Sequence, residues 1–506
     1  MRRLSVLVGV WALSLVAFGL EPHGSWAAPA QLPLVPYPRQ VVIGEGVFDC
    51  GTNAVKLAFA TVTRDASLPA EGYRLSVTPT AIRVTAADAA GEFYAGVTLG
   101  QLETVVGGRH LVTAAEIEDA PAYRWRGLHL DVSRHFFGVP TIKRYLDAMA
   151  EHKLNVFHWH LVDDQGWRLE LEGFPQLTRV GARRPSTPSV HDDAVADGVP
   201  YGPYFYTREE VREVLAYAAA RHIRVVPEIE IPGHSWALLA AYPELGCPNA
   251  ERYTAACDGW GIFKGVVCAG NPDTYRMLER ILDQVCEIFP SEIIHIGGDE
   301  APKDNWKACE LCQARMRELK LADEDQLQAS MTRHFVDYLA KKGRRAIGWD
   351  EIMKGGLPGG ALVMSWNGKA GGMAAAQDGH DVVMVPSDSC YLDMSQGLGM
   401  DDPFEYPPCS WGHVTTLERV YRFDPAEGIG PEARAHVLGG QANLWTERIW
   451  SETELFWKAY PRACALAEVL WTADPERRYA DFLGRMRIHR GRLFERGIPC
   501  APTGGR

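Results

Sequence analysis

The sequence predicts an α/β fold, a (β/α)8 TIM barrel that follows a small α+β domain. The chain has 506 residues, which is more than one ordinary core holds, so we expect two domains. From Arg124 onward, short apolar runs that end in polar residues alternate with helical patterns, which is typical of βα units around a parallel sheet. Eight such runs begin at Trp125, Asn155, Arg224, Glu292, Arg344, Ala361, Asp381 and His436. Eight is the number of strands that closes a barrel of this kind.

The segment before the barrel predicts the small α+β domain. Residues 73–77 and 81–85 alternate in hydrophobicity, which favours two strands, and residues 92–105 favour a helix. The Asp-Ala-Pro sequence at residues 119–121 marks a joint, because proline interrupts regular structure. The expected domains are therefore residues 28–122 for the α+β domain and residues 123–506 for the barrel.

The helices between the barrel strands should each present one apolar face to the sheet. Two sets of apolar residues recur at helical spacing, Ile142, Tyr145, Leu146 and Met149, and Leu278, Ile281, Leu282 and Val285. Thr207 and Glu210 have the spacing of a capping box, which predicts that a helix begins just after Thr207. In such barrels the active site lies at the carboxyl ends of the strands, so the polar residues that close each run become candidates.

The N-terminus has the order of a signal peptide. Arg2 and Arg3 precede an apolar run from Leu4 to Leu20, and small residues follow, so we predict a signal peptide over residues 1–27. An uncleaved membrane anchor is the alternative. The sequence has no Asn-x-Ser/Thr acceptor, which favours a bacterial periplasmic or extracellular protein over a lysosomal one.

The composition narrows the class of partner. A hydrophobic fraction of 46% and a charged fraction of 23% are those of a soluble globular protein. The net charge of -12 argues against a nucleic acid or an anionic membrane surface and favours a neutral small-molecule substrate.

The cysteines could form disulfides or take part in metal or redox chemistry. Eleven cysteines leave at least one unpaired if the rest form disulfides, and their connectivity stays open. The spacing Cys309-x-x-Cys312 suggests redox or zinc chemistry. No second such pair exists and an exported chain meets oxidising conditions, so we favour a disulfide partner or loop staple here.

Asp299 and Glu300 are the strongest catalytic candidates. They follow Gly297 and Gly298, and two residues without side chains would leave room for a ligand to approach the backbone. Neighbours on an extended strand point to opposite sides. The two carboxylates are therefore poorly placed to act as the acid and nucleophile of an ordinary retaining glycosidase, and we expect them to have different roles.

Four motifs resemble glycoside hydrolase family 20, the β-N-acetylhexosaminidases. They are HWHLVDDQGWR at residues 158–168, EIEIPGH at residues 228–234, HIGGDE at residues 295–300 and NLWTE at residues 443–447. The resemblance covers the barrel from Arg124 to about Trp471, and Leu34 to Pro121 resembles the domain that precedes it in that family. It implies substrate-assisted hydrolysis, in which the 2-acetamido oxygen of the sugar attacks the anomeric carbon and an oxazolinium intermediate forms.

The resemblance also implies roles for the site residues. Glu300 would be the general acid and base, and Asp299 would accept a hydrogen bond from the acetamido N–H and stabilise the positive charge. The remaining residues would form the substrate site. Tyr391 would donate to the acetamido oxygen, and Trp349, Trp366 and Trp445 would enclose the acetamide and the sugar in an aromatic box. Arg134, Asp393 and Glu447 would bind the outer hydroxyls of a terminal sugar, and Asp163 and His234 would form a supporting pair behind Glu300. Cleavage would be exo-acting from the non-reducing end, and the resemblance implies no metal and no cofactor.

Two alternatives remain open at this point. His158 and His160 share one side of a strand, a spacing that metal-dependent barrel hydrolases use for a divalent ion. A non-catalytic sugar-binding protein is the second alternative, although the intact Asp299 and Glu300 argue against it. The natural substrate stays open among chitooligosaccharide, peptidoglycan fragment, glycan and glycolipid, as do the preference for gluco or galacto sugars and the oligomeric state.

Overall fold

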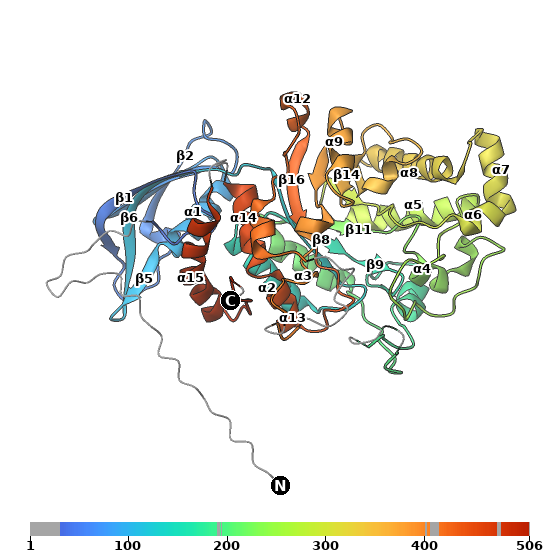
Figure 1. The fold of residues 1–506 in the computed structure, drawn as a ribbon, viewed down its shortest axis with the longest axis horizontal. Coiled ribbons are helices and arrows are strands. Elements are labelled where there is room, and N and C mark those ends of the chain that lie inside the picture. The colour runs from blue at the N-terminus through green and yellow to red at the C-terminus, as the bar shows by residue number, and fades with distance from the viewer. Residues whose placement is uncertain are drawn as a thin grey trace, which may run out of the picture. The chain divides into compact units, whose positions relative to one another are not determined.

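A computed structural model describes residues 31–189, 193, 195–399, 402–404, 414–472 and 477–504. The predicted signal peptide lies outside the described residues. The described residues divide into two compact units, one built on Gln40–Asp119 and one of Pro33–Arg39 with residues from Ala120 onward (Figure 1).

The smaller unit is an α+β structure built on one sheet. Its strands pair in the order β1-β6-β3-β4-β2, with β5 beside β6. The bounds are β1 Gln40–Asp49, β2 Ala60–Arg64, β3 Tyr73–Thr78, β4 Ala81–Ala86, α1 Ala89–Gln101, β5 Glu103–Val106 and β6 Arg109–Asp119. The two strands predicted at residues 73–77 and 81–85 are β3 and β4, an antiparallel pair that buries Leu75 and Val84.

The helix of this unit is shifted from its prediction. It begins at Ala89, because the Asp88 side chain accepts a hydrogen bond from the Gly91 N–H. It ends at Gln101 instead of residue 105, because Glu103–Val106 forms β5 and pairs with β6. The turn between the two strands is Gly107-Gly108, with φ of 58° and 79°, a conformation that suits glycine. The expectation of a helix over residues 92–105 was therefore wrong at its C-terminal end.

The larger unit is a closed barrel of eight parallel strands, as the sequence predicts. The strands are β7 Trp125–Asp131, β8 Val156–His160, β11 Arg224–Glu228, β12 Ile293–His295, β13 Arg345–Trp349, β14 Leu362–Ser365, β15 Val382–Met384 and β16 Val437–Ala442. Each lies within one of the eight predicted runs. The short hairpin β9 Val162–Asp163 and β10 Gly166–Trp167 follows β8.

The helices of this unit alternate with the barrel strands (Figure 1). Their bounds are α2 Val139–Glu151, α3 Arg208–Ala219, α4 Trp236–Ala241, α5 Pro272–Ile288, α6 Asp304–Ala308, α7 Glu310–Leu319, α8 Glu324–Lys341, α9 Ala370–Gln377, α10 Ser387–Cys390, α11 Leu417–Arg422, α12 Pro431–Arg434, α13 Glu452–Ala459, α14 Arg462–Trp471 and α15 Tyr479–Glu495. The two predicted apolar faces, on α2 and α5, are fully buried. Thr207 caps α3, and the predicted capping box with Glu210 is present.

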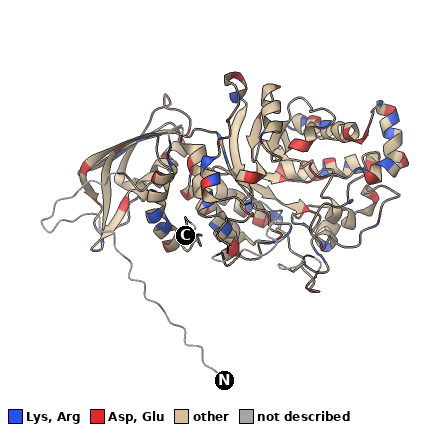
Figure 2. Ribbon diagram, in the orientation of Figure 1, with Lys and Arg blue, Asp and Glu red and all other residues tan. Residues whose placement is uncertain are grey.

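Charged residues of both signs are interspersed along the ribbon of each unit (Figure 2). Within the described part of the chain, no helix combines the length and the hydropathy that crossing a bilayer requires.

Candidate active site

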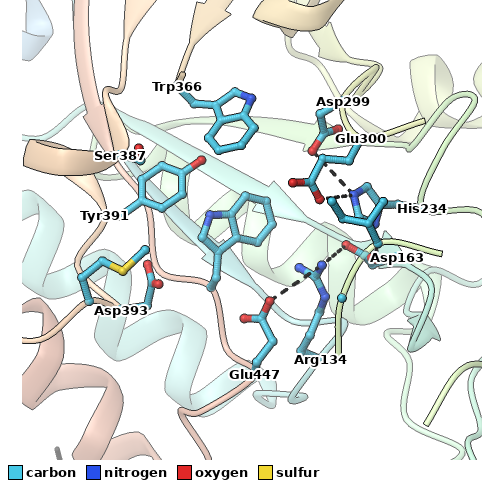
Figure 3. A pocket seen from close by; sticks show the side chains of 14 residues that line it. Arg134, Asp163, His234, Asp299, Glu300, Trp366, Ser387, Tyr391, Asp393 and Glu447 are labelled. Carbon is cyan, nitrogen blue, oxygen red and sulfur yellow. Dashed lines mark ion pairs between the residues drawn. The ribbon is translucent and has the colours of Figure 1, made fainter. Parts of the chain in front are cut away.

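A cavity of about 260 Å³ opens at the carboxyl ends of the barrel strands (Figure 3). Ten of the eleven site residues predicted from the sequence line it, together with four others. The lining residues are Arg134, Asp163, His234, Gly261, Ile262, Asp299, Glu300, Trp366, Ser387, Tyr391, Asp393, Met394, Trp445 and Glu447. The barrel topology thus brings residues from segments far apart in the sequence into one small cavity.

Asp299 and Glu300 both point towards His234 (Figure 3). The Nε2 atom of His234 lies 3.6 Å from an oxygen of Asp299 and 3.5 Å from an oxygen of Glu300. The expectation that the two carboxylates point to opposite sides was wrong, because β12 ends at His295 and the backbone then leaves the extended conformation. Glu300 itself has φ of 42°, in the left-handed region.

Gly297 and Gly298 do not open space for a ligand, as the sequence had suggested. A Cβ atom on Gly297 would lie 1.8 Å from a carboxylate oxygen of Glu230, and one on Gly298 would lie 2.4 Å from Ile352. Both glycines have positive φ, 63° and 106°. They therefore allow the loop after β12 to turn tightly against buried neighbours.

Two aspartates hold His234 from behind. The Nδ1 atom of His234 lies 3.1 Å from Asp163 and 3.2 Å from Asp164. Burial disfavours the charged imidazole, but Asp163, Asp164 and Asp299 outweigh it and raise the pKa of His234 well above its ordinary value. A positively charged His234 thus faces both catalytic candidates and fixes the position of their carboxylates.

Asp299 is the more enclosed of the pair. Its side chain is 10% exposed against 30% for Glu300, and its Oδ1 atom has no hydrogen-bond partner among the described residues. Burial raises the pKa of the Asp299 carboxyl well above its ordinary range, with His234 acting in the opposite sense. A hydrogen-bond donor or a positive charge that comes to lie beside Asp299 will therefore stabilise its ionised form strongly.

Arg134 joins two acids at another side of the cavity. Its guanidinium lies 2.9 Å from Asp163 and 3.9 Å from Glu447 (Figure 3). Burial and the nearby Glu447 carboxylate raise the pKa of Asp393 to about 7, and the Asp393 Oδ1 atom has no partner among the described residues. This end of the cavity offers charged groups that suit the hydroxyls of a sugar.

Aromatic rings form the opposing walls. The rings of Trp366 and Tyr391 are nearly parallel with centroids 6.1 Å apart, and Trp445 lies 6.2 Å from Tyr391. Trp366 is held by a hydrogen bond of 2.9 Å from its indole N–H to Glu351. Such walls exclude water and offer flat faces to a ring or an amide.

Trp349 is the one predicted site residue that is not among the cavity-lining side chains. It is 1% exposed, and its indole N–H donates to Glu228 at 2.8 Å. Its ring centroid lies 5.9 Å from that of Trp445. In this structure Trp349 therefore supports Trp445 from the barrel interior.

His158 and His160, the candidate metal ligands, lie fully buried in the barrel around Glu228. One Glu228 oxygen contacts His158 at 3.1 Å and His160 at 2.5 Å, and the other contacts His295 at 2.8 Å and Trp349. Burial opposes a charge on His160, but Glu228 and Asp163 raise its pKa to about 10. The second ring nitrogen of His160 lies 2.8 Å from Asp163, so this cluster supports the floor of the cavity through hydrogen bonds.

Several residues near the site were missed or set aside in the sequence. Asp164 and Glu230 were not among the predicted site residues, because a strand-end hydrogen bond accounts for such acids, yet Asp164 contacts His234 and Glu230 packs below Gly297. Glu351 fixes Trp366. Gly261 and Ile262 come from a long loop that carries no motif, and nothing in the sequence placed that loop at the cavity.

Comparison with known protein families gives one result. Residues 123–474 match the catalytic domain of glycosyl hydrolase family 20, and residues 51–120 match domain 2 of that family. A beta-hexosaminidase of Porphyromonas gingivalis is 42% identical over 468 residues, which cover 91% of this chain and 57% of that protein. A beta-hexosaminidase of Akkermansia muciniphila is 34% identical over 476 residues, which cover 93% of this chain and 92% of that protein.

Solved structures give the same picture. An exo beta-N-acetylglucosaminidase from Vibrio harveyi, solved in complex with N-acetylglucosamine, superposes with a TM-score of 0.83 at 29% identity, covering 94% of this chain and 79% of that chain. An N-acetyl-beta-hexosaminidase from Streptomyces plicatus, in complex with Thio-NAglucal, superposes with a TM-score of 0.77 at 30% identity, covering 94% of this chain and 98% of that chain.

Proposed function

The chain belongs to glycosyl hydrolase family 20, and from that premise we propose that it removes terminal β-linked N-acetylhexosamine residues from the non-reducing ends of glycans by substrate-assisted catalysis. The names of the relatives, beta-hexosaminidases and exo beta-N-acetylglucosaminidase, support the reaction class. The observation that carries the mechanism is the buried Asp299 Oδ1 atom, an acceptor without a partner among the described residues, in a cavity walled by Trp366, Tyr391 and Trp445.

Asp299 would accept the N–H of the 2-acetamido group. The aromatic walls would hold the acetamide so that its oxygen lies under the anomeric carbon, in the geometry of attack. As the oxygen attacks, positive charge spreads over the forming oxazolinium ring. The ionised form of Asp299 is disfavoured in the free site, so this charge stabilises the carboxylate more in the transition state than in the ground state.

Glu300 would supply the proton. It is the more exposed of the two carboxyls and lies 3.5 Å from the His234 ring. In the first step it would protonate the departing glycosidic oxygen. In the second step the resulting carboxylate would take a proton from water, which attacks the anomeric carbon, opens the oxazolinium ring and restores the acetamide.

The size and charge of the cavity support an exo-acting enzyme. A volume of about 260 Å³ lies just below the usual range of small-molecule pockets, about 300–1,000 Å³. Arg134, Asp393 and Glu447 would bind the outer hydroxyls of one terminal sugar and close that end of the site. A defined tetramer of β-linked N-acetylglucosamine should therefore lose one monomer at a time, and release of dimers would contradict the exo mode.

The mechanism is tested by weakening the nucleophile in the substrate. Replacing the acetyl hydrogens of p-nitrophenyl N-acetyl-β-glucosaminide with one, two and three fluorines lowers the nucleophilicity of the carbonyl oxygen. If the substrate supplies the nucleophile, kcat/KM falls progressively along this series, and the Asp299→Asn variant retains its fold but loses most activity on the parent compound. A flat series, or a sugar trapped covalently on an enzyme carboxylate, would overturn substrate assistance.

The same preparation separates the two remaining alternatives. A well-folded protein that binds N-acetylglucosamine but shows no turnover over a wide pH range would be a sugar-binding protein. Loss of activity to a chelator, regained with a divalent metal at unchanged Tm, would favour a metal-dependent hydrolase.

A further inference from the structure

Four buried cysteines converge at one point outside the cavity. Cys247, Cys268, Cys309 and Cys312 are each at most 3% exposed, and their sulfur atoms all lie within 4.8 Å of one another. Cys247 follows the 3-10 turn Pro243–Leu245, Cys268 precedes α5, and Cys309 and Cys312 lie at the start of α7. Segments separated in the sequence therefore present four thiols to a common centre.

The distances between the sulfur atoms can be compared with those of a metal bound by four thiolates. The Sγ atom of Cys312 lies 3.8 Å from that of Cys247 and 3.6 Å from that of Cys268, and the Cys268–Cys309 distance is 3.9 Å. A tetrahedron of thiolates about 2.3 Å from a zinc ion has edges of about 3.8 Å. No disulfide joins the described cysteines, and the three Sγ–Sγ distances are close to these edges.

We propose that Cys247, Cys268, Cys309 and Cys312 bind one zinc ion in a closed, tetrahedral, structural site. Zinc fits because four soft thiolates in tetrahedral arrangement are its preferred donor set, shared only with iron-sulfur chemistry. All four positions come from the protein, so no coordination position is left for water or substrate. The metal would act on stability and loop position and take no part in the hydrolysis.

The backbone around the cysteines is built for their approach. Gly246 and Val267 form an isolated antiparallel bridge, and the Cys268 N–H donates to the Leu245 carbonyl at 2.7 Å. Gly270 lies so close to α7 that a Cβ atom there would be 2.3 Å from the Cys312 nitrogen. Only glycine permits this approach of the Cys268 loop to the first turn of α7, which is an observation independent of the sulfur distances.

The sequence spacing did not reveal this centre. The pair Cys309-x-x-Cys312 had no second pair at similar spacing, so a disulfide or loop staple was favoured. The other two ligands stand singly in the sequence, at Cys247 and Cys268, and the fold brings them together at either end of a loop. The proposed zinc ion would serve as a staple of this loop in place of a disulfide.

The position of the site links it to the cavity. The loop between Cys247 and Cys268 carries Gly261 and Ile262, which line the cavity, and Cys309 follows Glu300 by nine residues. One zinc ion would thus fasten both the cavity loop and the segment that leaves the catalytic pair. This inference stands apart from the proposed reaction, because it concerns metal content and not turnover.

The first test needs no variant. The full chain is purified without added metal or chelator, dialysed, and analysed by inductively coupled plasma mass spectrometry; we expect one zinc per chain. Unfolding in the presence of a chromogenic zinc indicator should release that zinc, and alkylation of the unfolded chain without reductant should label all four cysteines. Absence of stoichiometric zinc together with disulfides among these four cysteines would overturn the proposal, and stoichiometric iron would overturn the assignment to zinc.

The second test uses matched variants. Cys312→Ser and Cys268→Ser should lose the zinc, whereas Cys257→Ser should keep it, since Cys257 is equally buried in the same loop but lies outside the cluster. If a ligand variant fails to fold, cobalt substitution of the unaltered chain provides the test instead. Tetrathiolate cobalt gives strong sulfur-to-metal charge-transfer bands in the near ultraviolet and tetrahedral bands in the red, and a spectrum without both would contradict the four-cysteine shell.

Discussion

Glu300 differs from the other carboxyls of the cavity in its exposure and backbone conformation. Its side chain is 30% exposed and its φ is 42°, whereas the side chains of Asp299 and Glu447 are 10% and 20% exposed. Under the proposed mechanism, this strained backbone would place the carboxyl where it can reach a leaving group and later a water molecule.

Replacing Glu300 by glutamine should affect poor leaving groups most. The amide has the same shape but transfers no proton, so kcat/KM should fall by about 10²–10⁴-fold for alkyl and sugar leaving groups. With 2,4-dinitrophenol as leaving group the loss in kcat/KM should be much smaller, because this group departs without protonation. A leaving-group series measured on both proteins checks the result, with Tm as the control for folding. An equal loss in kcat/KM across the series at unchanged Tm would contradict the role of general acid.

Asp393 provides a prediction about pH. Burial and Glu447 raise its pKa to about 7, against about 3.9 in an unfolded chain. Between those values the folded protein keeps a proton that the unfolded chain has lost, so stability falls as pH rises, by up to about 1.4 kcal/mol per pH unit from this group. Asp393→Asn should remove that contribution. The free energy of unfolding, measured from pH 4 to pH 7, should therefore decline less steeply with pH in this variant than in the unaltered protein.

Asp388 is a matched control for this experiment. Its hydrogen bonds to Ser389 and Arg419 hold its pKa below the ordinary value despite partial burial. Its carboxyl is therefore ionised in both folded and unfolded chains from about pH 5 to pH 7, and Asp388→Asn should leave the slope unchanged over that window. Equal slopes for the unaltered protein and Asp393→Asn would show that Asp393 titrates normally.

At the level of single residues, the sequence predicted the members of the cavity better than their surroundings. Asp299, Glu300 and His234 stand in motifs that the family resemblance identifies. Contacts such as Asp164 with His234, or Glu230 below Gly297, depend on how separate loops fold against each other, and no pattern of spacing encodes them.

The loop after β12 is the element that sets the positions of Asp299 and Glu300. The strand ends at His295, and Gly297 and Gly298 turn the chain so that the next two carboxyls face His234. The Gly297 carbonyl accepts a hydrogen bond from the backbone N–H of Trp349 at 2.9 Å, and the Gly298 carbonyl accepts one from the side-chain amide of Gln328 at 2.6 Å. The turn is therefore held by the neighbouring strand and by α8.

Gly297→Ala should be strongly destabilising. A side chain at φ of 63° costs about 1–2 kcal/mol, and overlap of its Cβ atom with Glu230 adds to this, so we expect a loss of about 2 kcal/mol or more. Gly359→Ala is the control, because a Cβ atom there meets nothing within 4 Å. Denaturant unfolding of both variants gives the comparison, and a Gly297→Ala protein as stable as Gly359→Ala would refute the proposed packing.

Elements with a strong period were predicted with more success than their ends. All eight barrel runs became strands, and the capping box at Thr207 starts α3. The error in the first unit came from Glu103–Val106, where pairing with β6 prevailed over the helical pattern. Sheet pairing is a tertiary contact, so a local sequence window does not contain it.

At the scale of the whole molecule, the barrel gathers charge inside as well as at its surface. Glu228 and three histidines fill the interior below the cavity, and His160 connects them to Asp163. A sequence-based fold prediction fills a barrel with branched apolar residues. The polar floor found here holds Asp163, which in turn contacts His234, so the barrel core itself takes part in positioning the proposed catalytic pair.

The remaining prediction concerns where the whole chain works. If residues 1–27 are a cleaved signal peptide, expression of the full sequence in a bacterial host should yield a periplasmic protein whose intact mass corresponds to a start at Ala28. Introducing arginine at Leu13 and Leu15 should break the apolar run and keep the chain in the cytoplasm. A membrane-bound product that retains residues 1–27 would favour the uncleaved anchor.

The metal content of the exported protein can be compared with that of a cytoplasmic form without residues 1–27. The comparison tests whether export affects the zinc site, because thiols that oxidise before folding cannot bind zinc. We expect one zinc in both forms, since the four cysteines are buried once the chain has folded.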